Sequence, residues 1–197
     1  VHVFGPADRY PRVEHPHYTL PDGPLSKLQA MCSALKLARF IIVQPSFYGT
    51  DNRCMLDALD AAGLHAARGV AMVEDDVSDA ELQSMHERGV RALRLDLFLR
   101  ASLPLPERLA YIRRSIARVQ GLGWHVQFYT PGWVVRELIP YMTEFETDFV
   151  VDHMGYMLES DGLTRADFER LVQAMKQGRG WMKLSGPYRV AKDLDYA

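Results

Sequence analysis

The sequence predicts a parallel α/β fold that closes into a (β/α)8 TIM barrel, and three observations lead to this prediction. Short apolar segments rich in Val, Ile, Leu and Phe recur along the chain about every 25 to 30 residues, a spacing typical of βα units. Amphipathic helical patterns lie between them. Polar and aromatic residues cluster directly after the apolar segments, as they do at the mouth of a barrel, where active sites of this fold lie.

The expected strands are these apolar segments. Seven of them occur, at residues 1–4, 39–44, 68–73, 90–97, 124–129, 148–152 and 181–184. The run Phe-Ile-Ile-Val at residues 40–43 is apolar at every position, which is typical of a parallel strand covered on both faces. Since seven strands leave an eight-stranded barrel one short, we expect a single TIM-barrel domain over residues 1–197, truncated at both ends.

Helices are expected between the strands, at residues 25–37, 54–62, 79–88, 107–120, 134–141 and 166–177. Two of them begin with a capping box, formed by Ser78 with Glu81 and by Thr164 with Asp167. The chain has neither a Gly-x-Gly-x-x-Gly sequence after its first strand nor a P-loop sequence. Because such phosphate-binding loops accompany many open parallel sheets, their absence favours the closed barrel.

Composition and charge narrow the functional class. A chain of 197 residues, 48% of them hydrophobic, can bury one core, and a net charge of −2 argues against a nucleic-acid or membrane-surface binder. No apolar run approaches the length that crosses a bilayer. The two cysteines, Cys32 and Cys54, lie in expected helices, so we expect free thiols and a cytoplasmic protein. A homo-oligomer is compatible with the sequence.

Two histidines occupy positions where a barrel carries its chemistry. His2 and His153 lie at or near the ends of expected strands, whereas His125 lies at the start of its strand, where a structural role is expected. A histidine considered alone is more often a surface residue or a hydrogen-bonded core residue. Together they predict catalytic groups at one mouth.

Three arginines lie at or after the ends of expected strands: Arg94 and Arg100 flank the Leu-Asp-Leu-Phe-Leu segment at residues 95–99, and Arg189 follows the last strand. Guanidinium groups bind carboxylates with paired, charge-assisted hydrogen bonds, so they predict an anionic ligand such as a dicarboxylate. The alternative is that each pairs with a neighbouring acid such as Asp96. Hydroxyl groups in equivalent loops, which either bind the ligand or simply pack, belong to Ser46, Tyr48, Tyr129 and Tyr188.

Five short motifs follow one another in a specific order. They are His-Val-Phe-Gly-Pro at residues 2–6, Val-Gln-Pro-Ser through Gly-Thr-Asp-Asn at 43–52, Gly-Val-Arg-Ala-Leu-Arg at 89–94, Gly-Trp-His-Val at 123–126 and Val-Asp-His-Met-Gly at 151–155. With them, essentially the whole chain resembles the 2-pyrone-4,6-dicarboxylate lactonase group of the amidohydrolase superfamily (amidohydrolase family 2). The resemblance implies a (β/α)8 barrel that opens lactones, in several members without a bound metal.

The resemblance also implies roles for particular residues. His2 and His153 would act on the scissile carbonyl. The carboxylates of the ligand would be bound by Arg94, Arg100 and Arg189, and the pocket would be completed by Ser46, Tyr129 and Tyr18. The group's general base, an aspartate in a Gly-Thr-Asp-Trp-Pro type motif, has no counterpart in these residues, and the first histidine of the superfamily's His-x-His motif would precede Val1.

Two departures from the group bear on specificity and on metal binding. Tyr48 stands where the lactonase has a histidine, which points to a related lactone or a sulfonate as a further possible substrate. Tyr129 stands where much of the superfamily has a metal-binding histidine. We therefore expect no required cofactor, with a single zinc or other divalent ion held by His2 and His153 as the alternative.

Together these expectations predict a hydrolase that opens a small carboxylated lactone such as 2-pyrone-4,6-dicarboxylate. The resemblance implies a role in the degradation of aromatic compounds. The arginines would orient the lactone, the histidines would stabilise charge on its carbonyl oxygen, and water would attack. Two alternatives stay open: a zinc-dependent decarboxylase of the same superfamily, and a non-catalytic barrel that binds organic acids.

Overall fold

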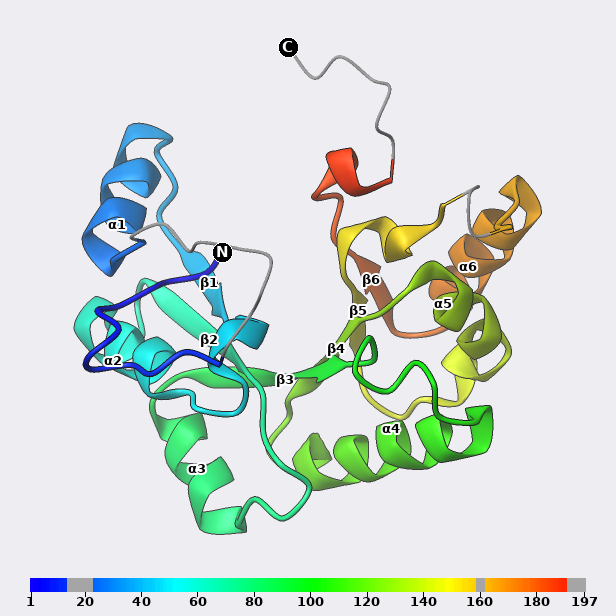
Figure 1. Cartoon of the computed structure of the whole chain (residues 1–197), viewed down its shortest axis with the longest axis horizontal. Coiled ribbons are helices and arrows are strands. Elements are labelled where there is room, and N and C mark those ends of the chain that lie inside the picture. The colour runs from blue at the N-terminus through cyan, green and yellow to red at the C-terminus, as the bar shows by residue number, and fades with distance from the viewer. Residues whose placement is uncertain (14–22, 159–161, 191–197) are drawn as a thin grey trace. The chain divides into compact units, whose positions relative to one another are not determined.

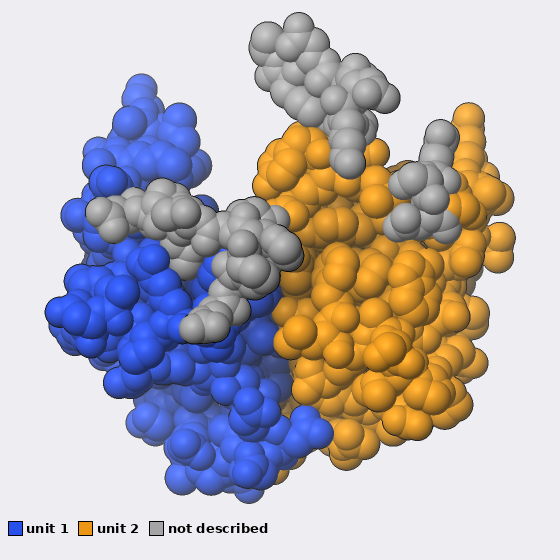
Figure 2. All heavy atoms as spheres, in the orientation of Figure 1, with its two compact units in different colours: residues 1–94 blue, residues 95–197 orange. Residues whose placement is uncertain are grey.

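The computed structural model describes residues 1–13, 23–158 and 162–190, and the chain forms two compact units, Val1–Arg94 and Leu95–Ala197 (Figures 1 and 2). Strands alternate with helices in both units, and the strand pairs β1–β2, β2–β3, β4–β5 and β5–β6 are all parallel. The predicted α/β class and parallel pairing are therefore confirmed.

In the described part of unit 1, three helices alternate with three strands. Its elements are α1 (Leu25–Ala34), β1 (Phe40–Val43), the 3-10 turn η1 (Ser46–Tyr48), α2 (Arg53–Ala62), β2 (Ala67–Ala71), α3 (Asp79–Glu87) and β3 (Val90–Asp96), the last of which runs into unit 2. Val43, Val70 and Ala92 form a buried cluster with one residue from each strand. Gly69 lets α2 pack closely on β2, because a Cβ there would lie 2.7 Å from the Leu59 side chain.

Unit 2 repeats the alternation. Its elements are α4 (Leu105–Gln120), β4 (His125–Tyr129), α5 (Gly132–Leu138), η2 (Ile139–Glu144), β5 (Phe149–Val151), η3 (His153–Tyr156), α6 (Arg165–Gln177), β6 (Gly180–Met182) and η5 (Pro187–Arg189). Phe128 of β4, Phe149 of β5 and Phe145 pack with ring centroids 5.7–5.8 Å apart. This aromatic group fixes β4 beside β5 in the core of the unit.

The strand predicted at residues 1–4 is wrong. The amino group of Val1 donates to the Ile41 carbonyl at 3.1 Å and the Val43 N–H donates to the Val1 carbonyl at 2.8 Å, so only Val1 follows β1 in a parallel manner. Beyond Val1, His2 contacts Val43, the last residue of β1, through its side chain, and the Phe4 N–H binds the Gly23 carbonyl at 2.8 Å. The described residues thus form six strands and not seven.

Most of the predicted helices agree with the structure to within a few residues. Both capping boxes are formed, at the starts of α3 and α6. The helix expected over residues 134–141 ends at Leu138 and continues as η2, where Pro140 has no N–H for a helical hydrogen bond. Cys32 and Cys54 are free and buried, as predicted. No helix in the described part of the chain is both long and apolar enough to cross a membrane.

Candidate active site

In unit 1, the chain segments that follow β1 and β2 meet at one guanidinium group, that of Arg94 in β3. Arg94 of β3 is only 6% exposed, and its Nη1 donates to the Ser46 hydroxyl at 3.0 Å and, at 3.5 Å, to the carbonyl of Gln44 after β1. The sulfur of Met72, after β2, lies 3.8 Å from the same nitrogen. The structure therefore brings together two of the predicted ligand-binding residues, Arg94 and Ser46, at the carboxyl ends of the strands.

Two buried amides shape the loop that carries Ser46. Gln44 is fully buried, and its Nε2 donates to the carbonyls of Gly49 and Asp51 at 3.0 and 2.9 Å. Asn52 donates to the Met72 carbonyl at 2.6 Å and accepts from the Met72 N–H at 3.1 Å, so it ties the loop after β1 to the loop after β2. We did not predict these roles, although both amides lie in the motif at residues 43–52.

His2 lies at the end of β1. Its Nδ1 is 2.7 Å from the carbonyl oxygen of Val43, the last residue of that strand. A carbonyl oxygen can only accept, so Nδ1 carries the proton of this hydrogen bond. In the neutral ring Nε2 then carries a lone pair, which suits a proton acceptor.

Tyr48 packs inside unit 1. Its side chain is 3% exposed, and its hydroxyl accepts a hydrogen bond from the Gly5 N–H at 3.2 Å. Burial is the main reason that the pKa of this phenol is raised, and the nearby Cys54 raises it further. In the structure Tyr48 holds the segment that follows His2, and its role in ligand specificity stays a prediction.

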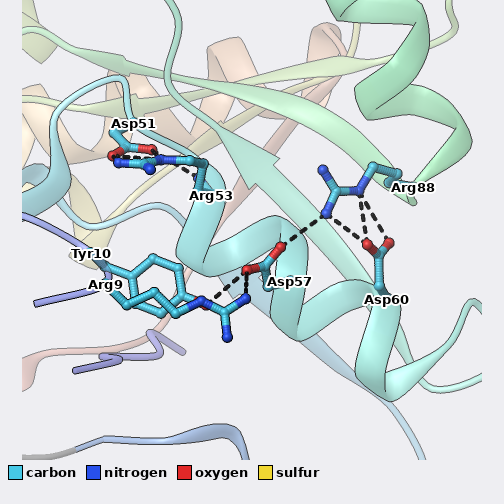
Figure 3. Close-up of polar contacts among 7 residues, drawn as sticks. All are labelled: Arg9, Tyr10, Asp51, Arg53, Asp57, Asp60 and Arg88. Atoms are coloured by element: carbon cyan, nitrogen blue, oxygen red, sulfur yellow. Dashed lines mark hydrogen bonds and ion pairs between the residues drawn. The ribbon is translucent and has the colours of Figure 1, made fainter.

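An ionic network ties the N-terminal segment to α2 (Figure 3). Arg9 and the Tyr10 hydroxyl both bind the Asp57 carboxylate, at 2.7 and 2.8 Å. Arg88 contacts the other oxygen of Asp57 at 3.3 Å and Asp60 at 2.6 Å. Burial and then the hydrogen bond to Asp57 raise the pKa of Tyr10 to about 12. These contacts fix the chain just beyond the predicted catalytic histidine of unit 1.

In unit 2, aromatic rings gather around His153, which directly follows β5 and Asp152. The rings of Tyr129, the last residue of β4, and of Tyr156 lie with centroids 6.3 and 5.7 Å from the imidazole. Phe98 lies 4.6 Å from Tyr129 and 5.1 Å from Tyr156. The predicted neighbours His153 and Tyr129 are thus adjacent, whereas Phe98 and Tyr156 join them without having been predicted.

Arg189 lies against this aromatic group. Its guanidinium carbon is 5.7 Å from the Tyr156 ring and 5.2 Å from the Tyr188 ring, and its Nε is buried without a hydrogen-bond partner in the described part of the chain. Burial opposes the charged form, but Tyr156, Tyr188 and Tyr129 outweigh it and raise the pKa of the guanidinium. Arg189 therefore offers a charged donor beside the His153 turn.

Other predicted residues have different surroundings. Arg100 stacks on the Tyr111 ring of α4 at 4.0 Å, and its Nη1 donates to the Asp96 carbonyl at 3.4 Å. His125 is the first residue of β4, as expected for a structural residue, and burial lowers its pKa. Tyr18 lies outside the described residues. Within residues 1–13, 23–158 and 162–190, no group of three or more His, Cys, Asp or Glu side chains is placed to hold a metal ion.

The chain matches a known protein family and two hydrolases of known substrate. The family profile described as "Amidohydrolase" matches residues 1–197. A 2-pyrone-4,6-dicarboxylate hydrolase of Comamonas testosteroni is 37% identical over 96% of the chain, and a 4-sulfomuconolactone hydrolase of Hydrogenophaga intermedia is 28% identical over 98% of it. The chain spans 62% and 63% of the lengths of these two relatives.

A solved structure has a similar fold. It is that of a probable 2-pyrone-4,6-dicarboxylic acid hydrolase of Acinetobacter baumannii with citric acid bound, which matches with a TM-score of 0.79 and 27% identity. The match covers 95% of this chain and 69% of that one. The α/β architecture is that of a TIM barrel, of which the matched residues form a part.

Proposed function

Because the chain belongs to the amidohydrolase family, we propose that the protein hydrolyses a small carboxylated lactone by water attack on the ring ester carbonyl. The observation that carries this proposal is the buried guanidinium of Arg94, held at 3.0 Å by Ser46 at the carboxyl ends of unit 1's strands. A buried cation at that edge suits an anionic ligand, because charge-assisted hydrogen bonds to carboxylates are strong where water is excluded.

The proposed chemistry follows the roles that the resemblance to the lactonase group implies for these side chains. In that scheme Arg94 and Arg189 bind carboxylate groups and orient the lactone ring. His153 donates a hydrogen bond to the carbonyl oxygen as negative charge develops there. His2, with its proton on Nδ1, offers Nε2 as an acceptor. In the lactonase group that the sequence resembles, an aspartate takes the proton from water, and we assign that role to none of the described residues.

The relatives support an anionic lactone as the substrate class. Among the proteins compared, one is a hydrolase of 2-pyrone-4,6-dicarboxylate and one a hydrolase of 4-sulfomuconolactone, and a solved relative binds citric acid. We propose the dicarboxylate lactone as the substrate and a cytoplasmic, metal-independent reaction. A sulfonated lactone is the second candidate, because the 4-sulfomuconolactone hydrolase aligns over 98% of the chain.

The test is loss of the ultraviolet absorbance of 2-pyrone-4,6-dicarboxylate on incubation with the full-length gene product, with and without a chelator. We expect hydrolysis that the chelator does not slow. Arg94→Met should raise KM by about 10- to 100-fold, since a hydrogen bond to a charged group contributes about 1.5–3 kcal/mol. Arg113→Met is the matched control, because Arg113 is exposed on α4 and pairs with Glu144.

Three results would change the proposal. An unchanged KM in Arg94→Met, with the fold verified by circular dichroism, removes Arg94 from the binding site. Hydrolysis of 4-sulfomuconolactone but not of the pyrone moves the proposal to the sulfonated substrate. Activity that chelation abolishes contradicts the metal-independent reaction.

A further inference from the structure

The turn that carries His153 has an unusual backbone. His153, Met154, Gly155 and Tyr156 have φ angles of 51°, 54°, 71° and 49°, so four consecutive residues lie in the left-handed region. For a residue with a Cβ this conformation costs about 1–2 kcal/mol, and only glycine adopts it freely. Such strain persists only where the surroundings enforce it, and it gathers at functional sites.

The segment that follows β6 enforces this turn. The Lys183 N–H donates to the Val151 carbonyl at 2.9 Å, and its carbonyl accepts from the Met154 N–H at 3.0 Å. The Lys183 ammonium also pairs at 2.8 Å with Asp152, which is 1% exposed and accepts a hydrogen bond from Gln127. Lys183 thus holds the chain on both sides of His153.

The same segment contacts the imidazole itself. The Ser185 hydroxyl lies 3.0 Å from His153 Nδ1. In extended chain, residues 183 and 185 point to the same side, whereas Leu184 between them is 83% exposed. Gly186, with a φ of 66°, leaves room for the ring, because a Cβ there would lie 3.2 Å from the same nitrogen. Lys183 therefore fixes the backbone of the turn, and Ser185 reaches its functional side chain.

We propose that Ser185 is a positioning residue that donates its hydroxyl proton to His153 Nδ1 and so keeps the ring proton on Nε2. This inference rests on the proposed function, in which His153 donates a hydrogen bond to the substrate carbonyl oxygen. Partners on the far ring nitrogen commonly set the tautomer and orientation of a functional histidine. The strained turn fixes where the ring lies, and the hydroxyl fixes which nitrogen carries the proton.

The experiment pairs kinetics with nitrogen-15 NMR of the His153 ring in the full-length protein. In Ser185→Ala we expect kcat to fall by about 10- to 100-fold, as for other residues that orient a functional histidine, with KM changed less than twofold. The NMR signals should move from an Nε2-protonated ring toward a mixture of tautomers. Ser185→Thr should restore both, because it keeps the hydroxyl. Ser115→Ala is the matched control, since the Ser115 hydroxyl binds the Tyr111 carbonyl within α4.

The two readouts separate this inference from the proposed function. An unchanged nitrogen-15 signature in Ser185→Ala overturns the inference, whether or not the protein opens a lactone. An unchanged kcat in a protein that is active also overturns it. If the unmodified protein opens no lactone, the proposed function fails, and the tautomer shift still decides whether Ser185 orients the ring.

Discussion

Replacing Asn52 by alanine should destabilise unit 1 more than the removal of any exposed side chain. Asn52 is 4% exposed and makes three hydrogen bonds, two donated to the carbonyls of Thr50 and Met72 and one accepted from the Met72 N–H. At about 1 kcal/mol net for each bond, the loss is about 3 kcal/mol. For a chain of this size, that corresponds to a fall in Tm of about 6–12 °C.

The assay is chemical and thermal denaturation followed by circular dichroism. Asn52→Asp should be destabilising to a similar degree, because it keeps the acceptor but loses both donated hydrogen bonds. Gln83→Ala is the control, since Gln83 is exposed on α3 and binds only Glu87 in the next turn, so its removal should change stability by less than about 0.5 kcal/mol. If Asn52→Ala matches this control, the inference that the amide joins the two loops is refuted.

Two further predictions concern stability. Ser78→Ala removes the side chain that accepts the Glu81 N–H at the start of α3, and should lower the free energy of unfolding by about 1 kcal/mol in urea titrations; an unchanged midpoint would contradict a stabilising capping box. Because folding raises the pKa of Tyr10 from 10.0 to about 12, its contribution to stability is complete below about pH 10 and is lost as the pH rises toward 12. Alkaline denaturation of Tyr10→Phe should lack this step, and an identical pH profile for the two proteins would show that the phenol does not stabilise the fold.

Local sequence patterns predicted the elements well because their causes are local. The capping boxes at Ser78 and Thr164 involve residues three positions apart, and the apolar runs that became β1 and β5 need only their own side chains to be recognised. The strand predicted at residues 1–4 failed for the opposite reason. Its ladder depends on how far β1 extends. That strand ends at Val43, which His2 contacts through its side chain, and the Phe4 N–H binds Gly23.

In the candidate site, too, the residue types could be predicted from the sequence, whereas their contacts could not. Sequence motifs and the ends of the expected strands pointed to Arg94, Ser46, His153 and Tyr129, and the structure places the first two in contact and the last two beside each other. Arg100 shows the limit of a motif, because its stacking on Tyr111 follows from the path of α4 and not from its neighbours in sequence.

By itself, the sequence determined the α/β class, the order of the elements and the residue types suited to an anionic ligand. Only the tertiary structure decided which partners these residues have. Ser185 meets His153 across 32 positions, and Arg94 meets Ser46 across 48. Such contacts depend on the register of parallel strands and on the turns after them, which form only when the strands pack into one sheet and bury their apolar side chains.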